Sequence, residues 1–256
     1  MLFITGLIML GVTAVLLAKT YAPSHNHSAS ITMAKPNTIL ALQAQPNTET
    51  WAKDWWLPRH RQKLAEIARN KNNIDLVFLG DSITHAWEGP GKYPWLQYYA
   101  SRNALNLGFS GDRTEHVLWR LQNGQFKNIQ PKVVVLMIGT NNTGHRQDKP
   151  EHTAQGIKAI IDLIHSKSPT TKILLLAIFP RGETNHDPLR QINEATNTII
   201  QQLANNKTIF WQNINHVFLT EDNMLTREVA DDFLHPNASQ YPKWAEAIEP
   251  FILQHF

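Results

Sequence analysis

One serine in this chain lies where a nucleophile would be useful. The mostly apolar residues 74–79 (Ile-Asp-Leu-Val-Phe-Leu) predict a short buried strand, Gly80 ends it, and the residues after Ser82 can begin a helix. Ser82 would then lie at the carboxyl edge of a sheet, beside a helix N-terminus whose backbone N–H groups favour developing negative charge. This position predicts a serine that can attack a carbonyl carbon.

Other predicted strand ends carry the groups that such a serine needs. Gly108 follows the second strand, and Asn141 follows the third within Gly-Thr-Asn-Asn. His235 lies near the C-terminus, three residues after Asp232. An ester hydrolase needs a hydroxyl nucleophile, a base, an acid that orients the base, and hydrogen-bond donors for the tetrahedral oxyanion. All of these residue types are present in this chain.

These blocks resemble those of the SGNH, or GDSL-type, hydrolase superfamily, which is named for its Ser, Gly, Asn and His. The matching positions are Ser82, Gly108, Asn141 and His235, with the family's acid at Asp232. The resemblance covers residues 74–252, and Ile83 stands where the family's short name has Leu. The stretches GDRTEHVLWRL (111–121) and FPRGE (179–183) resemble the catalytic subunits of intracellular platelet-activating-factor acetylhydrolase in particular.

The resemblance and the chemistry together assign roles. Ser82 would attack the ester, His235 would take its proton and return it to the leaving alkoxide, and Asp232 would orient the imidazole. The backbone N–H groups of Ser82 and Gly108 and the side-chain amide of Asn141 would form the oxyanion hole. Glycine permits close approach of the carbonyl, and asparagine donates without carrying a charge.

Three nearby residues offer alternatives. His85 would share a helix face with Ser82 and is a second candidate base, although it has no acid at a spacing that would orient it. Asp231 is a second candidate for the orienting acid, but Asp232 fits the family spacing. Asp81 is expected to cap the following turn rather than to react.

The elements that must position these residues alternate between strand and helix. Helices are predicted over 53–70, 114–123, 151–166, 188–205 and 239–255, and strands over 74–79, 104–107, 132–138, 172–178 and 208–211. Within two of these strands, residues 133–138 and 173–178 are apolar throughout, as expected for strands covered on both faces. We therefore expect a three-layer α/β/α domain with a five-stranded parallel, flavodoxin-like sheet.

Composition excludes several classes of function. The 256-residue chain has a formal net charge of only +3 with scattered basic residues, so we expect no nucleic-acid partner. It has no cysteine, which excludes thiolate catalysis and cysteine-based zinc sites. No histidine pattern of a metal site and no glycine-rich phosphate loop is present, so we predict neither a metal nor an organic cofactor.

The N-terminal residues differ from the rest. Residues 2–18 are uncharged and almost wholly apolar, and a helix of this length would span about 26 Å. We expect residues 1–22 to form an apolar helix that anchors the chain in a membrane, with a cleaved signal peptide as the alternative. Residues 23–50 are polar and predict a flexible tether, which leaves residues 51–256 as the esterase domain. Either N-terminal reading predicts the cell envelope, on the periplasmic side of the cytoplasmic membrane.

The sequence therefore predicts a serine esterase that removes short acyl groups, with acetyl suggested by the resemblance. Its substrate would be a small-molecule, carbohydrate or lipid ester. Transfer of the acyl group to an envelope polysaccharide, lysophospholipase or thioesterase activity, and a binding module without activity remain open. The resemblance also suggests a homodimer, although no residue pattern identifies its surface.

Overall fold

The computed structural model describes residues 38–256. The predicted anchor (1–22), its apolar helix and most of the predicted tether lie outside these residues. Within residues 38–256, no helix is both long and apolar enough to cross a membrane.

Five parallel strands form the central sheet, as the sequence predicts. They are β1 (Leu76–Gly80), β2 (Ala104–Gly108), β3 (Val133–Met137), β4 (Lys172–Leu176) and β5 (Ile209–Gln212). The strand order is β2-β1-β3-β4-β5, which is the flavodoxin-like order. Strand β1 pairs with both β2 and β3, so that Gly80 lies between Gly108 and Met137. The order reverses at β1, and the carboxyl end of β1 is therefore where ligands bind in such sheets.

Eight helices lie among residues 38–256. They are α1 (Trp56–Asn70), α2 (Ser82–His85), α3 (Lys92–Tyr98), α4 (Thr114–Arg120), α5 (Thr140–Arg146), α6 (Pro150–Lys167), α7 (Pro188–Ile200) and α8 (Tyr241–His255). Short 3-10 turns supplement them, beginning with Leu40–Leu42. Every long predicted helix is present, with ends shifted by a few residues. The helices α3 and α5 were not predicted, although α5 begins inside the Gly-Thr-Asn-Asn block.

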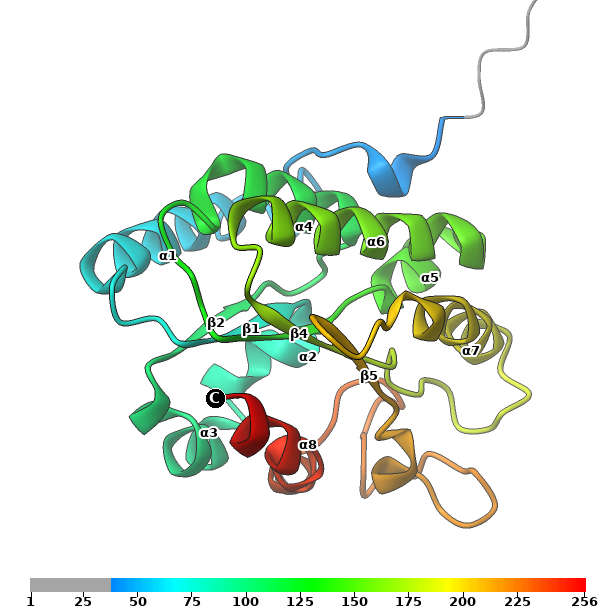
Figure 1. Ribbon diagram of the computed structural model, residues 1–256. Helices are drawn as coiled ribbons and strands as arrows, with labels where there is room; N and C mark the ends of the chain where they lie inside the picture. Colours follow the sequence, from blue (N-terminus) through cyan, green and yellow to red (C-terminus); the bar gives the residue numbers. More distant parts are fainter. Residues whose placement is uncertain (1–37) are drawn as a thin grey trace, which may run out of the picture. The chain divides into compact units, whose positions relative to one another are not determined.

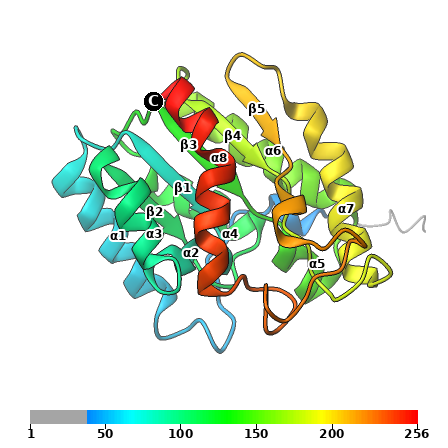
Figure 2. The ribbon, with the colours of Figure 1, turned by 90° about the horizontal axis from the view of Figure 1, so that it is seen from below.

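Helices cover both faces of the sheet, which gives the predicted three layers. Figure 1 shows α1, α4 and α6 on one face and α3 and α8 on the other, and Figure 2 shows α8 running across that second face. Because side chains alternate along a strand, Val77 and Leu79 pack under the first layer, whereas Leu76 and Phe78 pack under the second. Two apolar cores therefore hold the five strand ends in fixed positions.

The first described residues correct the predicted domain boundary. The 3-10 turn Leu40–Leu42 packs against α4 and α6, and the domain as a compact unit begins at Ile39. Thr114 donates its hydroxyl to the carbonyl of Ala41 at 2.9 Å, and the amide of Gln45 donates to the carbonyl of Glu115 at 3.3 Å. Residues 39–50 are therefore part of the domain, and the predicted tether is wrong over this range.

Candidate active site

Ser82, His235 and Asp232 form a continuous hydrogen-bonded chain. The hydroxyl oxygen of Ser82 lies 2.9 Å from Nε2 of His235, and Nδ1 of His235 lies 2.7 Å from Oδ2 of Asp232. Ser82 opens α2 directly after β1, whereas His235 and Asp232 come from a loop 150 residues later in the chain. The fold therefore brings together the three residues that the sequence predicted as a catalytic set.

The loop that carries His235 is held in a tight turn. Phe233 has a φ of 55°, in the left-handed region that aromatic residues rarely adopt. Its carbonyl accepts a 2.8 Å hydrogen bond from the amide of Gly182, and its ring lies 4.4 Å from the guanidinium of Arg227. This turn places Asp232 so that its Oδ1 accepts from the backbone amide of His235 at 2.8 Å.

These hydrogen bonds keep the orienting acid ionised. Partial burial raises the pKa of Asp232, but the backbone amide and ring of His235 lower it more, and the Leu234 amide adds to this effect. The net result is a pKa below the ordinary value of 3.8. A carboxylate at this position can hold the imidazole in one tautomer and stabilise its protonated form.

Asp81 caps the helix that begins at Ser82, as expected. Its carboxyl group accepts a 3.0 Å hydrogen bond from the amide of Ile83, and its side chain is almost wholly buried. Burial raises the pKa of Asp81 to about 7, and the nearby Asp112 carboxyl adds to this rise. The amide of Ser82 itself is a first-turn helix N–H with no hydrogen-bond partner in residues 38–256, so it is free to donate.

Asn141 and Gly108 differ in what they can donate. The side-chain amide of Asn141 gives one hydrogen to the carbonyl of Asp112 at 3.0 Å, which leaves its second hydrogen available. The amide of Gly108 donates to Oδ1 of Asn106 at 2.7 Å. A β-carbon at Gly108 would fall 2.1 Å from the amide nitrogen of His85, so this glycine is needed for close packing of α2. The structure therefore contradicts the prediction that Gly108 donates to the oxyanion.

A different glycine in the same loop has a free amide. The amide of Phe109 donates to the carbonyl of Gly80, and the amide of Ser110 donates to Nδ1 of His85. The amide of Asp112 donates to the carbonyl of Phe109. Gly111 is the remaining residue of the loop, and its N–H has no partner in residues 38–256. Gly111 precedes Asp112, whose carbonyl holds the Asn141 amide. It also has a φ of 72°, which favours glycine. In the sequence, Gly111 is the first residue of the GDRTEHVLWRL stretch that carries the family resemblance.

A buried ion pair fixes this loop from beneath. Asp112 accepts from Nε of Arg120 at 2.7 Å and from the indole of Trp56 at 2.6 Å. Arg120 is fully buried, also donates to the carbonyl of Leu107 at 3.2 Å, and lies 4.0 Å from the centre of the Phe109 ring. Burial raises the pKa of Asp112 to about 6, although the Arg120 charge opposes this rise. The loop that holds Gly111 is thus fixed before any substrate arrives.

The alternative base and acid occupy other positions. Nδ1 of His85 lies 2.9 Å from the hydroxyl of Ser110, and burial together with the Arg59 charge lowers the pKa of His85 to about 4. Asp231 accepts from the side-chain amide of Asn237 at 3.2 Å. Neither residue has a hydrogen bond to the Ser82–His235 pair, so the geometry favours His235 and Asp232 over both.

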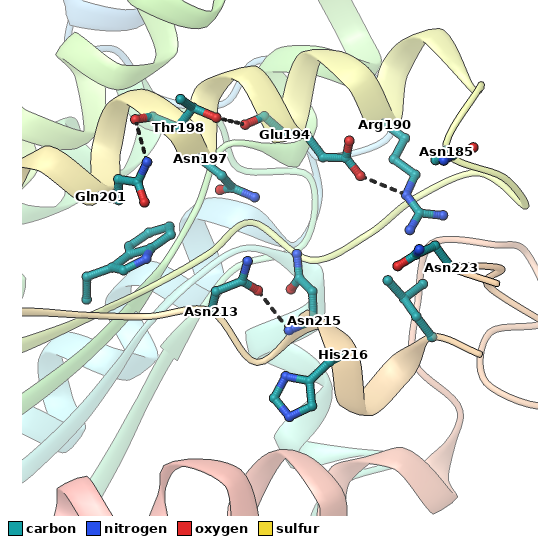
Figure 3. Close-up of a pocket in the computed structure, with 12 residues that line it drawn as sticks. Asn185, Arg190, Glu194, Asn197, Thr198, Gln201, Asn213, Asn215, His216 and Asn223 are labelled. Carbon is teal, nitrogen blue, oxygen red and sulfur yellow. Dashed lines mark hydrogen bonds and ion pairs between the residues drawn. The ribbon is translucent and has the colours of Figure 1, made fainter. Parts of the chain in front are cut away.

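An open cavity of about 420 Å³ borders the nucleophile. It is lined by Ser82, His85, Ala86, Glu88, Gly89 and Ser110, a set without large apolar side chains. A larger cavity of about 660 Å³ lies between α7 and the segment after β5, with Arg190 and Glu194 on one side and Asn213, Asn215 and His216 on the other (Figure 3). No predicted site residue lines that larger cavity.

Residues 38–256 contain no group of three or more His, Cys, Asp or Glu side chains that could hold a metal ion. The hydrogen bonds around Ser82 have the arrangement expected of a hydroxyl nucleophile with a base, an orienting carboxylate and free N–H donors.

Known proteins share both sequence and fold with this chain. Residues 78–242 match the GDSL-like Lipase/Acylhydrolase family. The chain belongs to this family. Platelet-activating factor acetylhydrolase IB subunit alpha2 of Homo sapiens is 34% identical over 206 residues, which cover 78% of this chain and 85% of the relative. Subunit alpha1 of Bos taurus is 32% identical over 203 residues, covering 78% and 83%.

Solved structures of this GDSL-family fold align over most of the chain. A GDSL-like lipase from Bacteroides thetaiotaomicron has a TM-score of 0.65 at 21% identity and covers 78% of this chain and 98% of that one. An acetylxylan esterase from Geobacillus stearothermophilus has a TM-score of 0.57 at 18% identity, covering 70% and 94%. The family membership and the acetylhydrolase relatives identify the chain as a carboxylic ester hydrolase.

Proposed function

We propose that this GDSL-family protein hydrolyses short-chain carboxylic esters, acetyl esters above all, through an acyl-enzyme on Ser82. The observation that carries the proposal is the hydrogen-bonded chain from Ser82 through His235 to Asp232, with distances of 2.9 and 2.7 Å. This is the arrangement that nucleophilic catalysis by a serine requires. The acetylhydrolase relatives support the acetyl group as the acyl part.

The chemistry follows from the geometry. The Ser82 oxygen attacks the ester carbonyl while Nε2 of His235 takes the hydroxyl proton, and the imidazolium then gives that proton to the leaving alkoxide. Water attacks the acyl-enzyme with the same histidine as base, which releases the carboxylic acid and restores Ser82. We assign the oxyanion hole to the amides of Ser82 and Gly111 and the side chain of Asn141, with Gly111 in place of Gly108.

The surroundings of Ser82 favour a short acyl group. The residues that line its cavity are small or polar, and Glu88 and His85 are among them. A long acyl chain would gain its binding energy from burial against large apolar side chains, at about 25 cal/mol per Å². The cavity beside Ser82 offers few such contacts, so chain length beyond acetyl should add little affinity.

The test is a series of p-nitrophenyl esters from acetate to palmitate with the wild-type chain and Ser82→Ala. We expect the highest kcat/KM on acetate or propionate and a loss of at least about 10³-fold in Ser82→Ala. Full activity in Ser82→Ala would exclude the mechanism, whereas a preference for palmitate would exclude only the short-acyl part. Asp231→Asn is a suitable control, because this neighbouring acid contacts Asn237 rather than His235.

We also propose that the esterase acts in the cell envelope. This rests on the uncharged apolar sequence of residues 2–18 alone, which lie outside the described residues. Fractionation of cells that express the full chain tests the location, with protease accessibility in spheroplasts as the second measurement. Recovery of the chain only in the cytosolic fraction would contradict it. The homodimer stays a prediction.

A further inference from the structure

Two tryptophans before α1 lie beside the proposed oxyanion hole. The ring of Trp51 packs directly on Gly111, since a β-carbon added to that glycine would fall 1.9 Å from the ring. Gly111 carries the free amide of the loop over residues 108–112. Trp51 therefore borders the position where the ester carbonyl must lie, and it belongs to a segment that the sequence assigned to the start of the domain without any functional role.

A second ring extends this surface toward the nucleophile. Trp55 lies with its ring centre 6.3 Å from that of Trp51, at an interplanar angle of 27°. Trp55 also lies 5.9 Å from the ring of His85, which lines the same cavity as Ser82. The indole of Trp55 donates to the carbonyl of Trp51 at 3.0 Å, which fixes the two residues relative to each other. We call Trp51 and Trp55 the aromatic wall.

The aromatic wall is accessible, and its border is polar. Trp51 is 49% exposed. The His145 ring lies 6.2 Å from that of Trp51, and its Nδ1 is 3.2 Å from the guanidinium of Arg113, which pairs with Glu49 at 3.1 Å. A flat apolar face is thus bordered by groups that accept and donate hydrogen bonds.

We propose that the aromatic wall binds the alcohol part of the ester and that this part is a pyranose ring. One face of a pyranose carries C–H groups that pack on an indole, while its hydroxyls at the ring edge need partners such as Glu49 and His145. A lipid chain would instead need a long apolar surface, which the Arg113–Glu49 pair interrupts. The proposal names the substrate class of the site and therefore rests on the esterase function proposed above.

The experiment compares three acetyl esters that differ only in their alcohol: ethyl acetate, methyl 6-O-acetyl-glucopyranoside and an acetylated ether phospholipid in micelles. The measured quantity is kcat/KM for the sugar ester divided by kcat/KM for ethyl acetate, in the full-length chain. Any general effect of a substitution on the oxyanion loop cancels in this ratio. We expect the wild-type chain to prefer the sugar ester over both other substrates.

Three substitutions of Trp51 distinguish the effect of a flat aromatic ring from the effect of side-chain volume alone. Trp51→Ala and Trp51→Leu should lower the ratio about tenfold or more, mainly through a higher KM for the sugar ester. Trp51→Phe keeps a ring against Gly111 and should stay within about threefold of the wild type. Tyr93→Ala is the matched control, because Tyr93 is an aromatic side chain that is 82% exposed on α3.

The outcomes that would overturn the sugar proposal differ from the outcome that would exclude the esterase function. A wild-type ratio in Trp51→Leu, or equal ratios in the Leu and Phe variants, would overturn the proposal while the esterase itself remained active. A preference for the acetylated phospholipid that depends on Trp51 would also overturn it. Full hydrolysis of ethyl acetate by Ser82→Ala would instead remove the proposed function, and that outcome is seen without any sugar ester.

Discussion

Replacing Asp81 with asparagine should stabilise the protein, and the gain should grow with pH. The carboxyl group beside the nucleophile is buried, and its pKa is raised from 3.8 to about 7. The folded protein therefore holds this proton more tightly than the unfolded chain does, so wild-type stability falls as pH rises from about 4 to about 7 and is level above that. At 1.36 kcal/mol for each pKa unit, the full effect is on the order of 4 kcal/mol.

Asparagine keeps the shape and the cap to the Ile83 amide but carries no charge at any pH. Between pH 5 and pH 8, the free energy of unfolding of Asp81→Asn relative to the wild type should rise by about 2–3 kcal/mol. Urea unfolding of both proteins at pH 5, 6, 7 and 8 measures this difference. Asp162→Asn, at an exposed side chain on α6, is the control that should show no such rise.

A difference between Asp81→Asn and the wild type that stays constant across this pH range would refute the reasoning, because it would mean that burial does not raise the pKa of this carboxyl. A difference of the opposite sign would mean that the ionised carboxylate stabilises the helix that begins at Ser82 more than burial destabilises it. Both results can be read directly from the two unfolding curves.

Three further substitutions test the site and its support. Asn141→Ala removes one oxyanion donor, so kcat on an acetyl ester should fall about 10²–10³-fold with little change in KM, and an unchanged kcat would exclude the role. Asp232→Asn should lower kcat by about 10⁴-fold in the same assay, whereas Asp231→Asn should stay near wild type; the reverse pattern would move the orienting acid. Arg120→Met leaves Asp112 buried without its cation and should lower the free energy of unfolding by about 3–5 kcal/mol, measured by urea denaturation; a change below 1 kcal/mol would contradict this.

The sheet was predictable because buried parallel strands leave a strong signal in the sequence. Residues 133–137 read Val-Val-Val-Leu-Met and form β3 with every residue buried. The helix α5 was not predictable in the same way, since Gly-Thr-Asn-Asn is also typical of a turn. What makes it helical is tertiary: Oδ1 of Asn142 accepts from the amide of Thr114, and its Nδ2 donates to Asp148.

The site was predictable in its side chains but not in its backbone donors. Ser82, Asp232 and His235 are distinctive residue types at distinctive spacings, and the structure joins them by hydrogen bonds. The choice between Gly108 and Gly111 depends on which amide already has a partner, and that partner is the side chain of Asn106. No local pattern states where the Asn106 side chain points. The GDRTEHVLWRL stretch contains Gly111, but the choice between the two glycines needed the hydrogen-bond partners that the structure shows.

The packed segment before α1 was missed for a different reason. Residues 23–50 are polar on average, but residues 39–42 within them read Ile-Leu-Ala-Leu. Ala41 is buried, and its carbonyl and the Gln45 amide also form hydrogen bonds with the rest of the domain. The composition of the whole segment predicted a tether because this short apolar run was averaged with its polar neighbours. The packing of this segment matters for the site, because Trp51 follows it directly and contacts Gly111.

Gly111 is therefore held from two directions. On one side, Asp112 is fixed by the buried Arg120 and by the Trp56 indole. On the other, the benzo edge of the Trp51 ring lies where a β-carbon on Gly111 would be. An N–H donor contributes most to an oxyanion when it needs no reorganisation at the moment of reaction. Fixing the loop on both sides meets that condition. A substitution of Trp51 therefore has two effects: it changes the surface proposed to contact the alcohol, and it changes how firmly the Gly111 N–H is held. The ratio of two acetyl esters separates these effects, since the donor acts on both substrates and the aromatic wall acts on one.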